Sequence, residues 1–142
     1  MKNRIAVILI SILTVGCFGL FDSGSETIVG KYKLLWIDLQ ENQVLCESYG
    51  ESGCIGLIPE YVFAVGHNDS YIIAKQHPTS GFEGGYEIYT DTTNYFIIDL
   101  DTNIKRESEK TIGPLNKIDF EKIRDCLKIS DIKFDITYPD SW

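Results

Sequence analysis

The sequence has few of the residue patterns on which common enzymes and metal proteins depend. It contains two histidines, His67 and His77, and no Cys-x-x-Cys or close histidine pair with the ligand spacing of a zinc site. No Gly-x-Ser-x-Gly motif marks a nucleophilic serine. The glycine-rich stretch 80–85 lacks the lysine of a phosphate-binding loop, so we interpret it as a connecting loop. We predict no metal and no cofactor.

Basic residues are also scarce. The 13 lysines and arginines are outnumbered by 21 acidic residues, and the net charge is −8 at pH 7. A nucleic-acid interface needs a basic patch, and adhesion to anionic lipid needs clustered cations, so the composition argues against both. The acidity is consistent with simple solubility or with a basic partner.

The chain also lacks long apolar runs. The apolar run at 5–15 has eleven residues, whereas a membrane-spanning helix needs about 20. Lys2 and Arg4 precede this run, and the small residue Gly16 follows it. A basic start, a short apolar run and a small residue at the cleavage position are typical of a secretory signal peptide.

The end of the run, Leu-Thr-Val-Gly-Cys at 13–17, resembles the processing site of bacterial lipoproteins. Such sites usually have leucine three positions before the cysteine, where this chain has Thr14. The resemblance implies cleavage between Gly16 and Cys17 and a lipid on the Cys17 sulfur. Two or three acyl chains give a stable anchor. The alternative is an ordinary secretory peptide followed by a chance cysteine.

The chain therefore divides into three expected segments. Residues 1–16 are the signal peptide, 17–27 the lipidated cysteine and its tether, and 28–142 a single β-rich domain. Cleavage would leave 126 of the 142 residues, enough for one domain, and the loss of two basic residues would make the net charge −10. The expected location is a membrane surface outside the cytoplasm, held through Cys17.

The other three cysteines suit an exported protein. Cys46 and Cys54 flank a turn-rich stretch between two apolar runs, so a hairpin would bring them face to face. A disulfide there would stabilise the fold by about 2–3 kcal/mol on the chain-entropy model. The alternative is that all three thiols are reduced. Cys126 remains unpaired, and we expect it to be buried as a small apolar residue.

The domain is dominated by strand patterns. Residues 31–36 alternate in the way of a half-buried strand, and the clearest hairpin joins 61–65 to 71–74 through Gly-His-Asn-Asp-Ser. Further strands are expected at 44–46, 55–58, 86–89, 95–98, within 104–112 and at 132–138, with 86–89 and 95–98 forming a second hairpin.

One helix is expected late in the chain. Gly113 and Pro114 give a stop, Asn116 is an expected N-cap, and apolar residues follow at helical spacing over 117–128. The expected fold class is α+β and mostly β. We predict an antiparallel sheet of about seven or eight strands, with one C-terminal helix followed by a last strand.

Several segments together resemble a known family. They are Ile-Pro at 58–59, the stretch 65–77, Tyr-Phe-Ile-Ile at 95–98, Gly-Pro-Leu at 113–115 and the later Phe120. This set is similar to small bacterial lipoproteins of unknown function. The resemblance implies a lipid-anchored domain and supplies no catalytic residue, because that family has no assigned activity.

Three residues on one strand form a candidate binding face: Tyr71, Lys75 and His77. Aromatic area beside a cation suits a ligand or partner, and the alternative is a strand rim with a solvated lysine. We expect both histidines to be exposed or capping side chains. About 20 Å of strand separates His77 from the turn that holds His67, so they cannot share a metal within this hairpin.

Acidic residues near the end of the 95–98 strand are a weaker candidate. The loop that holds Asp99, Asp101 and Asn103 lacks the glycine and the distal glutamate of an EF-hand, so we interpret it as a turn.

The functional hypothesis is a non-enzymatic, membrane-anchored domain that binds a protein or another component of the cell envelope. One alternative is an inhibitor or immunity-type lipoprotein, whose acidic surface would block a basic secreted hydrolase or toxin. Another is a hydrolase that uses His77 with an acidic residue such as Glu83.

Overall fold

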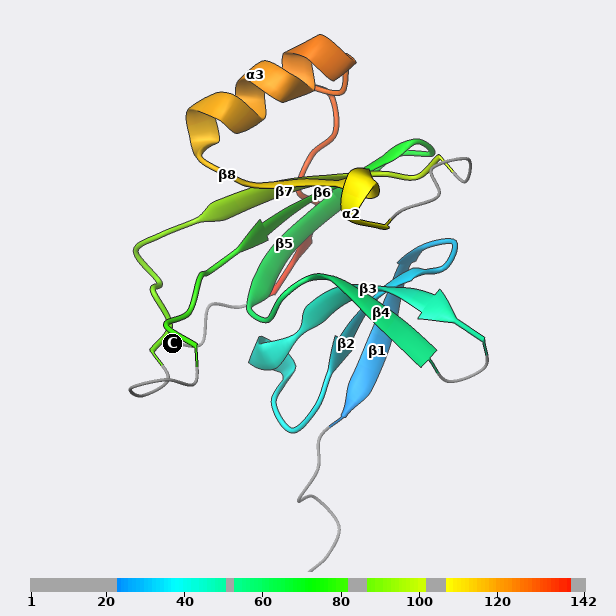
Figure 1. Cartoon of the computed structure of the whole chain (residues 1–142), viewed down its shortest axis with the longest axis vertical. Coiled ribbons are helices and arrows are strands. Elements are labelled where there is room, and N and C mark those ends of the chain that lie inside the picture. The colour runs from blue at the N-terminus through cyan, green and yellow to red at the C-terminus, as the bar shows by residue number, and fades with distance from the viewer. Residues whose placement is uncertain (1–22, 51–52, 82–86, 102–106, 139–142) are drawn as a thin grey trace, which may run out of the picture.

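A computed structural model describes residues 23–50, 53–81, 87–101 and 107–138 (Figure 1). Four strands come first: β1 (Gly24–Val29), β2 (Tyr32–Trp36), β3 (Val44–Tyr49) and β4 (Gly53–Ile58), with the 3-10 turn η1 (Gln40–Asn42) before β3. Five strands follow: β5 (Val62–His67), β6 (Tyr71–Gln76), β7 (Asn94–Asp99), β8 (Thr111–Leu115) and β9 (Ile136–Thr137). The helices are α2 (Glu107–Lys110) and α3 (Lys117–Leu127).

The described strands form two antiparallel sheets. The four-stranded sheet has the order β1-β2-β3-β4, and the five-stranded sheet has the order β8-β7-β6-β5-β9. Figure 1 shows three layers, with the five-stranded sheet between the four-stranded sheet and α3. The mostly-β α+β fold, with a late helix and a last strand, is confirmed. Its strands are divided between two sheets, where the alternation alone predicted one.

Two apolar cores hold these layers together. The first lies between the sheets and joins residues such as Leu34 and Leu45 of the four-stranded sheet to Ile72 and Ile98 of the other. The second lies between the five-stranded sheet and α3, where Ile73 and Ile97 meet Phe120, Ile129 and Ile132. Adjacent residues on β6 and β7 therefore enter different cores, and both faces of the five-stranded sheet are covered.

The predicted hairpin at 61–74 is confirmed as β5 and β6, paired from Val62 with Gln76 to His67 with Ile72. Asn68 closes its turn because its side-chain oxygen accepts hydrogen bonds from the backbone N–H groups of Ser70 and Tyr71, each at 2.8 Å.

The predicted helix is confirmed as α3. Asn116 caps it by accepting a hydrogen bond from the Asp119 N–H at 2.9 Å, and the chain leaves through Lys128 in the left-handed conformation. The expected apolar stripe, which contains Phe120, Ile123 and Leu127, faces the second core.

Four features of the secondary structure differ from the sequence prediction. First, β1 begins at Gly24, within the expected tether. Second, the hairpin of 86–89 with 95–98 is wrong, because β7 already pairs with β6 and β8; Ile88 forms only an isolated bridge with Thr79. Residue 86 lies outside the described ranges.

Third, Thr111–Leu115 is a strand that contains the expected stop, since a proline is tolerated at a sheet edge. It follows the short helix α2, and residues 104–106 lie outside the described part of the chain. Fourth, the last strand contains only Ile136 and Thr137, because Ile132 and Phe134 pack in the second core.

Candidate functional site

The expected lipid-attachment site lies outside the described residues. Gly16 and Cys17 belong to the segment 1–22, so the structure gives no geometry for them. None of the helices in the described part of the chain is long and apolar enough to cross a membrane.

The structure joins Cys46 of β3 to Cys54 of β4 in a disulfide, with their Cα atoms 5.8 Å apart. This is the pairing that the hairpin argument favoured. The bond connects the border strand β4 to the interior of its sheet. Cys126 is free and exposed on α3, so the expectation that it is buried is wrong. Cys126 is exposed because it lies beside the apolar stripe of α3 and not within it.

The candidate face of Tyr71, Lys75 and His77 is largely covered by the protein itself. Tyr71 packs against the second core. The ammonium group of Lys75 lies 4.4 Å from the ring centre of Phe134 and 5.9 Å from that of Tyr95. These contacts within the chain occupy the aromatic and cationic groups that were expected to meet a ligand.

His77 is buried, with 4% of its surface exposed, which corrects the expectation of an exposed or capping side chain. Its ring stacks on Phe63 with the ring centres 4.2 Å apart, and its Nδ1 donates to the carbonyl oxygen of Thr92 at 2.8 Å. It therefore ties the end of β6 to the 89–93 loop. A general base needs contact with substrate, and this placement disfavours that role. Glu83 lies outside the described residues.

Acidic residues gather around a shallow hollow lined by Asp69, Asp99 and Asp101. A side-chain oxygen of Asp99 accepts from the Asp101 N–H at 2.9 Å, as in the expected turn. Within the described ranges, no three His, Cys, Asp or Glu side chains come together as a metal site. Asn103 lies outside those ranges, and His67 is exposed at the end of β5.

A buried ionic cluster links β3 to α2. The carboxylate of Glu47 forms ion pairs with Lys31 and with Lys110, the latter at 3.3 Å. Burial alone would raise the pKa of Glu47, but the hydrogen bonds and positive charges of the two lysines outweigh it, and the pKa is lowered. Burial and then the charge of Glu47 raise the pKa of Tyr32. Sequence reasoning missed this cluster, because 63 positions separate Glu47 from Lys110.

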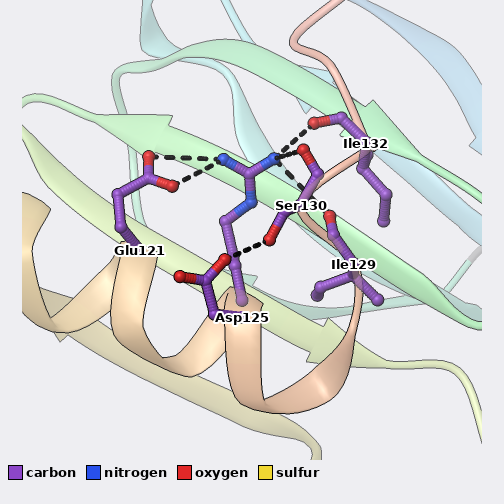
Figure 2. A network of polar contacts seen from close by, with 6 residues as sticks. Glu121, Asp125, Ile129, Ser130 and Ile132 are labelled. Atoms are coloured by element: carbon purple, nitrogen blue, oxygen red, sulfur yellow. Dashed lines mark hydrogen bonds and ion pairs between the residues drawn. The ribbon is translucent and has the colours of Figure 1, made fainter.

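A second polar network secures the end of α3 (Figure 2). The guanidinium group of Arg124 donates to the carbonyl oxygens of Ile132 at 2.6 Å and Ser130 at 3.0 Å, and it pairs with Glu121 at 3.1 Å. Figure 2 shows Glu121 on one side of this group and Ser130 and Ile132 on the other. The network fixes the loop after α3, so we assign it a structural role.

One surface that remains open among the described residues is an apolar hollow of about 440 Å³ at one end of the four-stranded sheet. Leu35 lines it from β2, and Ile37 and Leu39 line it from the loop that follows. Val44 lines it from β3, and Tyr61 from the segment that connects β4 to β5. Ile37 is 63% exposed and Leu39 57%. The polar lining is Asn42 and Glu60.

Buried glutamines hold the wall of the apolar hollow in place. The Gln43 side chain donates to the carbonyl oxygen of Val62 at 2.6 Å, and the Gln76 side chain donates to that of Glu60 at 3.0 Å. Between them, buried Tyr61 has φ of 68°, a left-handed conformation that costs about 1–3 kcal/mol in a bulky residue. The surrounding hydrogen bonds offset this cost, so the wall is preorganised.

The lining of the apolar hollow suits recognition rather than proton transfer. Its only charged lining residue is Glu60, and Asp38 is exposed between Ile37 and Leu39 in the chain. Large exposed apolar side chains mark interaction surfaces in soluble domains. The sequence carried a signal for this site, because apolar residues recur at 35, 37 and 39, the positions that continue the alternation of Lys31 and Lys33 and that these lysines would assign to solvent.

The fold and the hollow together define a three-layer β-rich domain with a preorganised apolar surface. The sequence matches the family described as "Protein of unknown function (DUF3997)" across residues 29–138, and the chain belongs to this family. No curated protein and no solved structure matches the chain.

Proposed function

We propose that this protein is a lipid-anchored, non-enzymatic domain outside the cytoplasm that binds a protein partner in the bacterial cell envelope. The observation that carries the binding part is the apolar hollow, where Ile37 and Leu39 are more than half exposed beside a rigid wall. Clusters of large apolar side chains gain most when a partner removes them from water.

The anchor part rests on the signal pattern that ends at Cys17. Six residues lie between Cys17 and the start of β1 at Gly24, and the seven residue steps that join them span at most about 23 Å. Gly24 pairs with Trp36, and Trp36 directly precedes Ile37. The start of the folded domain and the apolar hollow therefore share one end of the four-stranded sheet, which favours a partner close to the membrane surface.

Site-specific photocrosslinking in native membranes tests the binding part. We expect a photoreactive amino acid in place of Leu39 to give a discrete crosslinked partner, and the same amino acid in place of Ile118 to give none. Ile118 is a matched control because it is 80% exposed but lies on α3, away from the hollow. Equal crosslinking from both positions would reject the hollow as the binding site.

The anchor is tested separately by the intact mass of the mature chain. A diacylglycerol on Cys17 and the loss of residues 1–16 are the expected results, and Cys17→Ala should release the protein from the membrane fraction. An unmodified sulfhydryl at Cys17 would reject the anchor without affecting the crosslinking result.

The net charge of −8 favours a second candidate function, that of an inhibitor of a basic secreted hydrolase. Stoichiometric inhibition of a basic muramidase, weakened by salt and by Leu39→Glu, would support it. Turnover of the peptidoglycan by this protein itself would contradict both candidate functions.

A further inference from the structure

The described sheets have four border strands, and they differ in how they are protected. Native proteins protect sheet borders with charges, prolines, bulges or very short strands, because an open border can pair with another chain. The outer strand β1 contains Glu26, whose carboxylate accepts a hydrogen bond from the Tyr138 hydroxyl at 2.5 Å. The outer strand β8 contains Pro114, and β9 has only two residues.

The remaining border strand, β4, is protected only by a bulge at Leu57, and its pairing with β3 is regular from Gly53 to Gly56. Its sequence Gly-Cys-Ile-Gly-Leu-Ile has no charge and no proline. Within the described residues it pairs only with β3. Ile55 is 36% exposed, and a Cβ added at Gly56 would meet no atom within 4 Å. Among the described residues, no strand therefore pairs with the outer side of β4.

This strand is also held rigidly. Cα pairing with β3 is regular from Tyr49 with Gly53 to Cys46 with Gly56, it resumes at Leu45 with Ile58 after the bulge, and the disulfide fixes Cys54 to Cys46. A rigid border costs less conformational entropy when another strand pairs with it.

A second, smaller hollow adjoins β4. It measures about 290 Å³ and is lined by Gly56, Leu57, Ile58, Pro59 and the two residues it shares with the apolar hollow, Val44 and Glu60. The border of β4 and both hollows thus form one continuous surface. Glu60 lines both hollows, and its carboxylate favours a basic group on the occupant.

We propose that an extended segment of a partner protein pairs with β4 as a fifth strand of the four-stranded sheet. Alternate side chains of such a segment point to opposite faces. Its large apolar side chains lie over the two hollows, and a lysine or arginine two positions further along, on the same face, lies opposite Glu60. This inference rests on the proposed binding function and names the chemistry and the geometry of the partner.

The test measures backbone hydrogen exchange of the full chain in lipid nanodiscs, with synthetic peptides as probes. The first probe is an acetylated octapeptide in which isoleucine and lysine take turns at every second position, so that they share one face, with threonine at the positions between. The second has proline at two central positions and cannot complete a ladder. The third has glutamate in place of lysine. We expect the first probe alone to slow amide exchange in residues 53–58 at least threefold, with little change at 94–99.

Two substitutions on β4 and one matched control complete the test. Ile55→Lys and Gly56→Lys place a charge on the border, and each should weaken binding of the first probe at least tenfold. Ile118→Lys makes the same chemical change on α3 and should leave binding of the first probe unchanged. Two variants are used because Gly56 faces open space, so Gly56→Lys keeps the test valid if Ile55→Lys perturbs folding.

Three results would overturn strand pairing. One is equal protection by the proline-containing or glutamate probe. Another is protection without any peptide that rises with protein concentration, which would mean that a second copy occupies β4. The last is a Leu39 crosslink that persists in Ile55→Lys and Gly56→Lys. That last result would retain the proposed binding function and reject only the role of β4, whereas loss of the Leu39 crosslink in the wild-type chain would reject the binding function itself.

Discussion

The two sheets of this domain differ in what covers them. The five-stranded sheet is enclosed, with the four-stranded sheet on one face and α3 on the other. The four-stranded sheet contributes one face to the first core, and its other face carries the apolar hollow. The comparison separates the part of the molecule that maintains the fold from the part that is available to a partner.

The burial of consecutive residues along individual strands follows this difference in part. On β6 and β7, three consecutive residues are buried in each strand: Ile72, Ile73 and Ala74, and Phe96, Ile97 and Ile98. Consecutive burial is what a strand enclosed on both faces requires. On β2 the burial alternates, with Tyr32 and Leu34 buried and Lys33 and Leu35 partly exposed. The interior strand β3 of the four-stranded sheet also buries three consecutive residues, Leu45, Cys46 and Glu47, so consecutive burial marks interior strands and not the enclosed sheet alone.

The largest effect that would test this comparison is a cavity in the enclosed sheet. Ile97→Ala removes a fully buried side chain from the second core, and we expect a loss of about 2–5 kcal/mol in the free energy of unfolding. Ile37→Ala makes the same change in the apolar hollow and should cost less than about 0.5 kcal/mol. Urea denaturation of both variants measures the difference. Similar losses would contradict the division between the sheets.

Much of the architecture could be predicted from local sequence. The β5–β6 hairpin followed from the turn residues around Asn68, and α3 followed from Asn116 and the apolar spacing after it. The split into two sheets did not, because alternation within a strand does not determine which strands become neighbours. The mistaken pairing of 86–89 with 95–98 has the same origin, since β7 pairs on one side with β6 and on the other with β8.

A second test is removal of the disulfide from the four-stranded sheet. Replacing Cys46 and Cys54 by alanine should lower the free energy of unfolding by about 2–3 kcal/mol. Because the bond joins β3 to β4, hydrogen exchange should accelerate in these strands more than in β6 and β7. Cys126→Ala is the control, because that thiol is free and exposed. Uniform acceleration in both sheets would show that they unfold as one unit.

A third test concerns the layer that encloses the five-stranded sheet. Arg124→Met leaves the carbonyl oxygens of Ser130 and Ile132 without their donor, and we expect a loss of about 1–3 kcal/mol. Glu121→Gln removes only the partly exposed ion pair and should cost less than about 0.5 kcal/mol. Thermal and urea unfolding distinguish these values. An equal cost for both would mean that the Arg124–Glu121 pair, rather than the carbonyl contacts, stabilises the loop.

The sites were harder to predict than the fold. Hairpin geometry led to the Cys46–Cys54 pair, but the Tyr71, Lys75 and His77 face was chosen without knowledge that Phe134 and Tyr95 contact Lys75. Arg124 and Glu47 look like solvated charges in the sequence. Arg124 is buried because it donates to carbonyl oxygens six and eight residues further on, and Glu47 is buried beside Lys110, 63 positions away. Contacts over such separations are set by tertiary packing, which no local pattern records.

The smallest expected effect is a pH dependence at the junction of the two sheets. The folded pKa of Glu47 lies below its ordinary value of 4.5, because Lys31 and Lys110 stabilise the charged form more than burial destabilises it. A lowered pKa means that the unfolded chain binds a proton more readily than the folded one as the pH falls. The stabilisation is therefore complete above pH 4.5 and is lost as the pH falls through the folded pKa.

Substitution at Glu47 should remove this part of the acid sensitivity. We expect Glu47→Gln to flatten the dependence of unfolding free energy on pH below pH 4.5, measured by urea denaturation at several pH values. Lys110→Gln should have a greater effect than Lys31→Gln, because the Lys110 side chain is only 7% exposed and that of Lys31 is 43% exposed. Solvent screens the outer pair, so it contributes less. If both lysine variants behaved alike, the link from α2 to β3 would be no stronger than an ordinary surface contact.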